Sequence, residues 1–139
     1  MKKLLFFSIS IAFCFLLFSC EKTRDGLGLD TINNSARTGK WENVYYQVYT
    51  GDAGDPESSE NLTEGSAYVR FQSDNKVHFY NSDGVENPSE AMTYSFLDTK
   101  KITLNGQEYE IQENLAGSFA KMTLQRKTAS GREVYIFER

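Results

Sequence analysis

Residues 101–111 read KITLNGQEYEI, and this stretch predicts a β-hairpin. Asn105-Gly106 stands between two runs in which apolar and polar residues alternate. Asn-Gly in this setting is the strongest short hairpin signal, because both residues accept the positive φ angles of a type I′ turn. A two-residue turn sets Ile102 opposite Tyr109 on the apolar face, so the turn type and the apolar pattern indicate the same register.

A second hairpin is predicted for residues 67–80, on the N-terminal side of the first. Two alternating runs flank residues 73–75, and the odd-numbered apolar residues of both runs share a face. A three-residue turn with Asn75 in the left-handed region fits this spacing. It sets Phe71 opposite Val77, so the inner side of the hairpin is uniformly apolar.

The same alternation predicts strands along the rest of the chain, with no helix among them. In chain order the eight predicted strands are 40–50, 67–72, 76–80, 92–96, 101–104, 107–111, 120–125 and 134–136. For the last pair we expect Leu124 to oppose Val134 and Met122 to oppose Ile136, with Val134 and Ile136 on one face. Residues 51–65 read GDAGDPESSENLTEG and are expected to form a long acidic loop, either solvated or acting as a lid.

Eight consecutive antiparallel strands favour an all-β, up-and-down barrel over residues 39–139, because closure of the sheet removes both edges. A two-sheet sandwich is the alternative, but it needs several long cross-connections, and only residues 51–65 provide one. An eight-stranded barrel is just wide enough to be filled by side chains or to hold one small ligand.

The N-terminus predicts export and attachment to a membrane. Lys2 and Lys3 precede a charge-free run of residues 4–19, which is short for a transmembrane helix and typical of a signal peptide. The run ends in Leu17-Phe18-Ser19-Cys20, which resembles the lipobox of bacterial lipoproteins. We therefore expect a signal peptide at 1–19 and acylation of Cys20, with more than one acyl chain for stable anchoring. An ordinary unmodified thiol is the alternative for Cys20.

Residues 20–38 carry the expected lipidated cysteine and then a polar stretch, which predicts a flexible tether. Removing Lys2 and Lys3 leaves 13 basic residues against 19 acidic ones, a net charge of −6. This charge argues against binding to nucleic acid and against adhesion to anionic lipid headgroups.

The region 38–139 resembles the small lipocalin-like lipoproteins of the Bacteroidota. The resemblance rests on Gly39-Lys40-Trp41, which matches the Gly-x-Trp of lipocalins, and on Phe71-x-Ser-Asp-Asn before the third strand. The Thr-Asp-Tyr motif of many lipocalins is absent. The resemblance implies that Trp41 closes the narrow end of the barrel beneath Arg139, in a cation–π contact of about 0.5–2 kcal/mol. The alternative is an ordinary core tryptophan and a frayed C-terminal arginine. The resemblance also implies that the protein lies in the cell envelope, anchored to the outer membrane on either the periplasmic or the outer face.

The interior of the predicted barrel is the candidate ligand site. The apolar and aromatic side chains that we expect to line a cavity are Phe71, Phe79, Met92, Tyr94, Phe96, Tyr109 and Met122. Tyr94 and Tyr109 would supply the hydrogen bonds, and the ligand would be small and hydrophobic or aromatic. The alternative is a solid core, with a protein partner recognised through outward-facing Tyr68, Tyr80, Tyr135 and Phe137.

Catalysis, metal binding and cofactor binding find no support in the sequence. His78 is the one histidine and is expected to point outward, and the two cysteines are Cys14 and Cys20. A nucleophile–base pair, a His or Cys metal site and a glycine-rich phosphate loop are therefore not expected. The sequence predicts a non-catalytic binding or interaction module without a cofactor.

Overall fold

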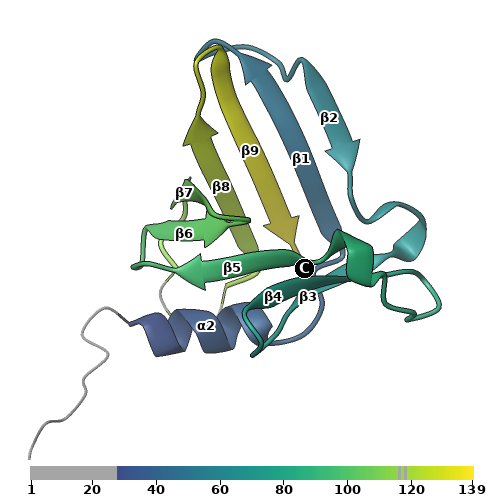
Figure 1. Cartoon of the computed structure of the whole chain (residues 1–139). Helices are drawn as coiled ribbons and strands as arrows, with labels where there is room; N and C mark the ends of the chain where they lie inside the picture. Colours follow the sequence, from purple (N-terminus) through teal and green to yellow (C-terminus); the bar gives the residue numbers. More distant parts are fainter. Residues whose placement is uncertain (1–27, 116, 118) are drawn as a thin grey trace, which may run out of the picture.

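The computed structural model describes residues 28–115, 117 and 119–139. Its strands form one nine-stranded antiparallel sheet that curls into a half-barrel (Figure 1). The strands are β1 (Asn43–Thr50), β2 (Ser58–Asn61), β3 (Tyr68–Phe71), β4 (Lys76–Tyr80), β5 (Met92–Phe96), β6 (Lys101–Leu104), β7 (Gln107–Ile111), β8 (Lys121–Lys127) and β9 (Gly131–Glu138). The helices are α2 (Leu29–Arg37) and the 3-10 turns η2 (Glu64–Ser66) and η3 (Pro88–Glu90). The expected signal peptide and Cys20 lie outside the described residues.

The sheet has the order β2-β1-β9-β8-β7-β6-β5-β4-β3, so β2 and β3 are its two edges. A fully closed barrel would require β2 and β3 to pair with each other by backbone hydrogen bonds. Instead, Trp41 and Val69 form an isolated bridge just before β1, with reciprocal N–H···O bonds of 2.9 Å. The all-β, barrel-like fold is as expected, but the sheet stays open above this bridge.

The count of eight strands is corrected by β2, which lies inside the predicted acidic loop. Its sequence is Ser-Ser-Glu-Asn, and all four residues are exposed. A strand without apolar residues gives no period-two signal, because that signal depends on one buried face. β2 is held instead by backbone pairing to β1, for example Tyr46 with Glu60.

Both predicted hairpins have the expected register. Ile102 lies opposite Tyr109 across the Asn105-Gly106 turn, where both turn residues have positive φ. Phe71 lies opposite Val77, and Asn75 has φ 61° in the left-handed region. Turn chemistry and apolar alternation therefore specified these two registers together.

The predicted register of the last pair, β8 and β9, is wrong by one residue. Leu124 pairs with Tyr135, and Met122 pairs with Phe137. A shift of one residue exchanges the two faces of a strand, so Tyr135 and Phe137 point inward and Ile136 points outward. Phe137 is fully buried in the core. The expectation of Tyr135 and Phe137 as outward contact residues is therefore wrong.

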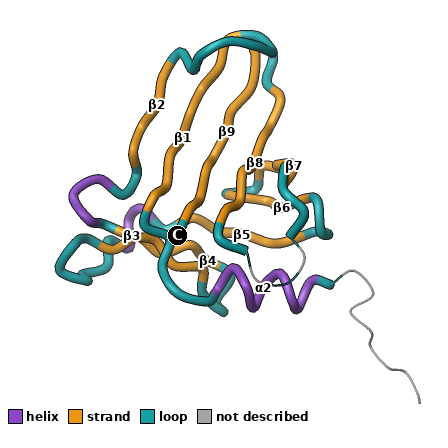
Figure 2. The backbone as a smooth tube through the Cα atoms, turned by 180° about the vertical axis from the view of Figure 1, so that it is seen from behind, coloured by secondary structure: helices purple, strands orange, loops and turns teal. Residues whose placement is uncertain are grey.

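The predicted flexible tether is also corrected, because α2 occupies residues 29–37 (Figure 2). Ile32 and Ala36 lie one turn apart and are both fully buried against the barrel. With Leu29 they recur at helical spacing, which gives the short helix one apolar face. The folded unit therefore begins before residue 39, the boundary expected from the sequence.

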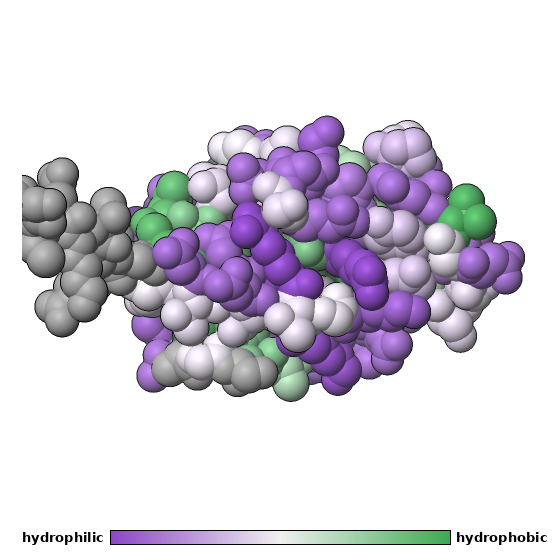
Figure 3. All heavy atoms as spheres, turned by 90° about the horizontal axis from the view of Figure 1, so that it is seen from below, coloured by the Kyte–Doolittle hydropathy of each residue, from purple (hydrophilic) through white to green (hydrophobic). Residues whose placement is uncertain are grey.

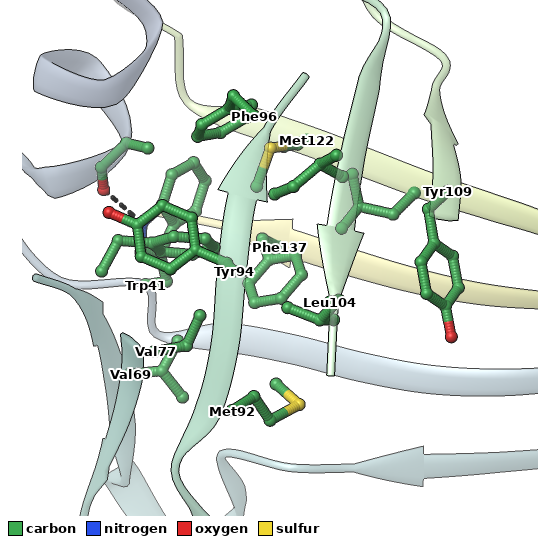
Figure 4. Packing of buried hydrophobic residues seen from close by; sticks show 14 of the residues in the cluster. Trp41, Val69, Val77, Met92, Tyr94, Phe96, Leu104, Tyr109, Met122 and Phe137 are labelled. Carbon is green, nitrogen blue, oxygen red and sulfur yellow. Dashed lines mark hydrogen bonds between the residues drawn. The ribbon is translucent and has the colours of Figure 1, made fainter. Parts of the chain in front are cut away.

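A single apolar cluster joins α2 to the inner face of the sheet (Figure 4). Its centre is aromatic, with Phe71 5.3 Å from Phe137 and 4.8 Å from Tyr94 between ring centroids, both edge-on. Edge-to-face pairs of this kind add about 0.5–1.5 kcal/mol each beyond the burial of their area. The lower part of the half-barrel is therefore solid.

A candidate ligand cleft with an aromatic floor

Above the solid core, the inner faces of the two halves of the sheet separate and leave a cleft of about 550 Å³. Its lining comes from β1, β2 and β9 on one side and from β4, β5, η3 and the β6–β7 turn on the other. The lining residues are Tyr46, Glu60, Asn61, Leu62, Phe79, Glu90, Met92, Asn105 and Tyr135. A volume of this size suits a small organic molecule, since such sites run from about 300 to 1,000 Å³.

The floor of the cleft is aromatic and apolar. The rings of Tyr46 and Tyr135 lie 4.7 Å apart on paired positions of β1 and β9. Phe79 and Met92 close the opposite side, and both are buried. Alternation places these side chains, because every second residue of each strand faces inward.

The rim is polar, and its charges are all negative. Glu60 lies on β2 and Glu90 on η3, and both are exposed. Neither carboxylate has a salt-bridge partner within the described part of the chain. The side-chain oxygen of Asn61 instead accepts a hydrogen bond from the Thr63 backbone N–H at 3.0 Å, which fixes the chain where it leaves β2.

The phenols of the floor stay protonated well above neutral pH. Burial, followed by the nearby phenols and Glu133, raises the pKa of Tyr135 strongly. Burial and then Glu133 also raise the pKa of Tyr46. At neutral pH these groups are therefore uncharged hydroxyls that can donate or accept a hydrogen bond.

A paired arginine lies beside the floor. Arg126 Nη2 is 2.6 Å from Glu133 Oε2, and its Nη1 donates to Gln107 Oε1 at 3.2 Å. The Tyr109 hydroxyl donates to the same Glu133 oxygen at 3.3 Å. Arg126 is thus neutralised locally and held by three side-chain hydrogen bonds, two of them to Glu133.

Two of the seven predicted cavity residues, Phe79 and Met92, line the cleft. The other five belong to the packed core and do not line it, namely Phe71, Tyr94, Phe96, Tyr109 and Met122. The Tyr94 hydroxyl donates to the backbone oxygen of Gln72 at 2.9 Å and accepts from Arg37 Nε at 2.8 Å. Its hydrogen bonds are therefore used within the protein, as commonly holds for a buried tyrosine.

Most residues of the cleft carry no clear signal in the sequence. Tyr46 and Tyr135 lie in strands whose two faces are both aromatic or β-branched, so alternation alone did not show which face is inner. Glu60 and Leu62 lie in the stretch assigned to a loop. The available signal was Leu62 itself, an isolated apolar residue in an acidic segment, and it packs against the core cluster.

The closed end of the half-barrel brings together Trp41 and Arg139. The Arg139 guanidinium lies 4.0 Å from the centre of the Trp41 ring, which is the contact predicted from the sequence. The indole Nε1–H of Trp41 donates to the backbone oxygen of Ala36 at 3.0 Å (Figure 4). Arg139 also donates to that oxygen. Gly39 has φ 75°, a conformation that favours glycine, at the turn from α2 into β1.

The one histidine lies outside the cleft, on the outer face of β4. Its Nδ1 is 2.6 Å from Glu86 Oε1, and its Nε2 is 2.8 Å from Asp74 Oδ2. Burial lowers the pKa of His78, but the two carboxylate hydrogen bonds outweigh it and raise the pKa overall. This cluster joins the β3–β4 turn to the loop that follows β4.

In the described ranges, no group of three or more His, Cys, Asp or Glu side chains is arranged to hold a metal ion. No helix within those ranges is long and apolar enough to cross a membrane. Seen from below, the surface is mainly hydrophilic with small, separate hydrophobic patches (Figure 3).

Compared with known proteins, the chain matches no family model and no curated protein.

Proposed function

We propose that this protein is a non-catalytic binding protein that holds a small molecule with an aromatic or apolar body in the cleft. The observation that carries the proposal is the 550 Å³ cleft itself, with buried Phe79 and Met92 facing Tyr46 and Tyr135. An apolar floor with a few polar groups at the rim is the usual make-up of a small-molecule site. The residues that line the cleft include no histidine, cysteine or lysine.

The proposal extends to the setting of the protein. A half-barrel with Trp41 beneath Arg139 supports a lipocalin-like origin, with the open seam as its main departure. The sequence of residues 1–20 supports export, acylation of Cys20 and a place at the outer membrane of the cell envelope. Replacing Cys20 with alanine should abolish incorporation of labelled fatty acid, and labelling that persisted would contradict the anchor.

Native mass spectrometry of the full-length protein, isolated in detergent from its own host, tests the binding function. We expect a reproducible small adduct that is lost on denaturation. The variant Leu62→Trp places an indole in the cleft and should remove the adduct. Leu97→Trp is the matched control, because Leu97 is 42% exposed and does not line the cleft. An adduct that survives Leu62→Trp would place the ligand elsewhere.

A second candidate function, recognition of an envelope protein, is favoured by a different observation. Tyr68 and Tyr80 stack on the outer face of the β3–β4 hairpin, with ring centroids 5.0 Å apart and planes at 10°. Val85, in the loop after β4, is 62% exposed. Aromatic residues are enriched at interfaces. Loss of a crosslinked partner in a Tyr80→Ala, Val85→Ser variant, with the adduct retained, would support this candidate.

A further inference from the structure

The charge of the cleft indicates what kind of molecule would occupy it. Glu60 and Glu90 stand on opposite walls, on β2 and η3, and no lysine, arginine or histidine is among the lining residues. Neither glutamate is ion-paired within the ranges that the structure describes. Two carboxylates without an ion-pair partner, at the mouth of a cleft with an aromatic floor, leave a negative charge that a bound cation would compensate.

The floor adds a second attraction for a cation. The faces of aromatic rings carry negative electrostatic potential, and a cation within about 6 Å of a ring centroid is attracted to it. The Tyr46 and Tyr135 rings, tilted by 37° to each other, form such a surface in the cleft. In this protein, Lys40 and Arg132 already lie over the rings of half-buried tyrosines, with Lys40 3.9 Å from the centroid of Tyr68.

The titration behaviour of the floor agrees with a negative local potential. After burial and the neighbouring phenols, Glu133 and Glu60 both contribute to the raised pKa of Tyr135. Arg126 lowers the pKa of Tyr46, but it is paired with Glu133 at 2.6 Å, so this pair carries no net charge and Glu60 supplies the net negative charge beside the floor. An anionic ligand such as a fatty acid would therefore meet repulsion at the rim and no free cation at the floor.

We propose that the ligand is an organic cation, an amine joined to an aromatic or apolar body. Its body would lie against Phe79, Met92 and the two tyrosines, and its ammonium group would face Glu60 and Glu90. This inference rests on the proposed binding function and specifies the ligand class of that same cleft. Each partly exposed charge pair contributes little, so we expect a preference over a neutral analogue of about threefold to tenfold.

The test uses three probes that share a naphthalene body and carry a cationic, a neutral or an anionic polar group: 1-naphthylmethylamine, 1-naphthalenemethanol and 1-naphthoic acid. Their dissociation constants are measured at pH 7 by titration calorimetry with the full-length protein in a non-ionic detergent, against detergent alone. We expect the amine to bind most tightly and the acid most weakly. The amine's advantage should shrink as salt is raised, because salt screens exposed charges.

The double variant Glu60→Gln, Glu90→Gln should bring the amine and the alcohol to equal affinity. Glu110→Gln is the matched control, because Glu110 is exposed on the outer face of β7 and its loss should leave the order unchanged. Equal binding of amine and alcohol to the unmodified protein would overturn the cation inference and leave the binding function standing. Failure of all three probes to bind would count against both.

Discussion

Arg139, the last residue of the chain, covers the ring of Trp41 at 4.0 Å and joins the end of β9 to the start of β1. The same guanidinium donates to the backbone oxygens of Ser35 and Ala36 at the end of α2. The Ser35 oxygen also accepts from the backbone N–H of Thr38, the C-cap residue, at 3.3 Å. A cation at a helix C-terminus also interacts favourably with the helix dipole. One side chain therefore joins three elements.

Replacing Arg139 with alanine should lower the free energy of unfolding by about 1–3 kcal/mol, because it removes the cation–π contact and two hydrogen bonds. Urea denaturation followed by Trp41 fluorescence measures the loss. Lys127→Ala is the control, since Lys127 is exposed and a surface change of this kind stays within about 0.5 kcal/mol. Equal effects of the two variants would show that Arg139 does not support the closed end.

Replacing Ile32 with alanine tests whether α2 belongs to the folded unit. Ile32 is fully buried between the helix and the barrel, so its truncation should cost about 2–4 kcal/mol in unfolding free energy. Asn34→Ala, on the exposed side of the same helix, should change stability little. If Ile32→Ala were as stable as the unmodified protein, α2 would not be packed in solution.

His78 should titrate above the ordinary histidine value, because its ring lies between Asp74 and Glu86. The cluster stabilises the fold most where the ring is protonated and Asp74 is ionised, at about pH 4–6.5, and loses this effect as pH rises through the raised pKa of His78. NMR titration of the ring gives the value without ambiguity, since the chain has one histidine. Glu86→Gln should lower this pKa, and an unchanged value would show that the Glu86 contact is absent.

The phenols of the floor should ionise late in a spectrophotometric titration. Burial raises the pKa of the floor residues Tyr46 and Tyr135, and also that of Tyr109 in the packed core, above the ordinary tyrosine value. Their contribution to stability is therefore complete below about pH 10 and is lost as pH rises toward the folded values, because the unfolded chain releases its protons first. Tyr135→Phe should remove the latest-titrating phenol, whereas Tyr45→Phe on the outer face should not. A normal titration of Tyr135 would contradict the buried floor.

The sequence predicted those parts of the fold that local rules specify. The Asn105-Gly106 turn and the turn at Asn75 determined two registers, because turn geometry and alternation agreed. The predicted register of β9 against β8 is wrong by one residue, because the outer face of β9 carries the apolar residues Val134 and Ile136 and resembles an inner face. When both faces are apolar, alternation does not distinguish them, and the partner strand decides.

The candidate site was less predictable than the fold. Glu60 and Leu62 reach the cleft through β2, a strand that is held by backbone pairing rather than by its own residues. Tyr94 is polar and faces inward, which predicts a place in a cavity. Its hydroxyl instead accepts a hydrogen bond from Arg37 on α2. Both differences depend on contacts between distant segments, and one sequence by itself does not show such contacts.

The packing of α2 would set the orientation of the protein on a bilayer if the proposed lipid anchor is present. If Cys20 carries acyl chains, only eight peptide steps separate it from Gly28, and a fully extended chain of that length reaches at most about 28 Å. With such an anchor, the closed end of the half-barrel, where α2 packs, would lie close to the lipid headgroups. The cleft takes none of its lining from α2, the element nearest the anchor. A ligand would therefore enter the cleft from the aqueous side and not from within the membrane.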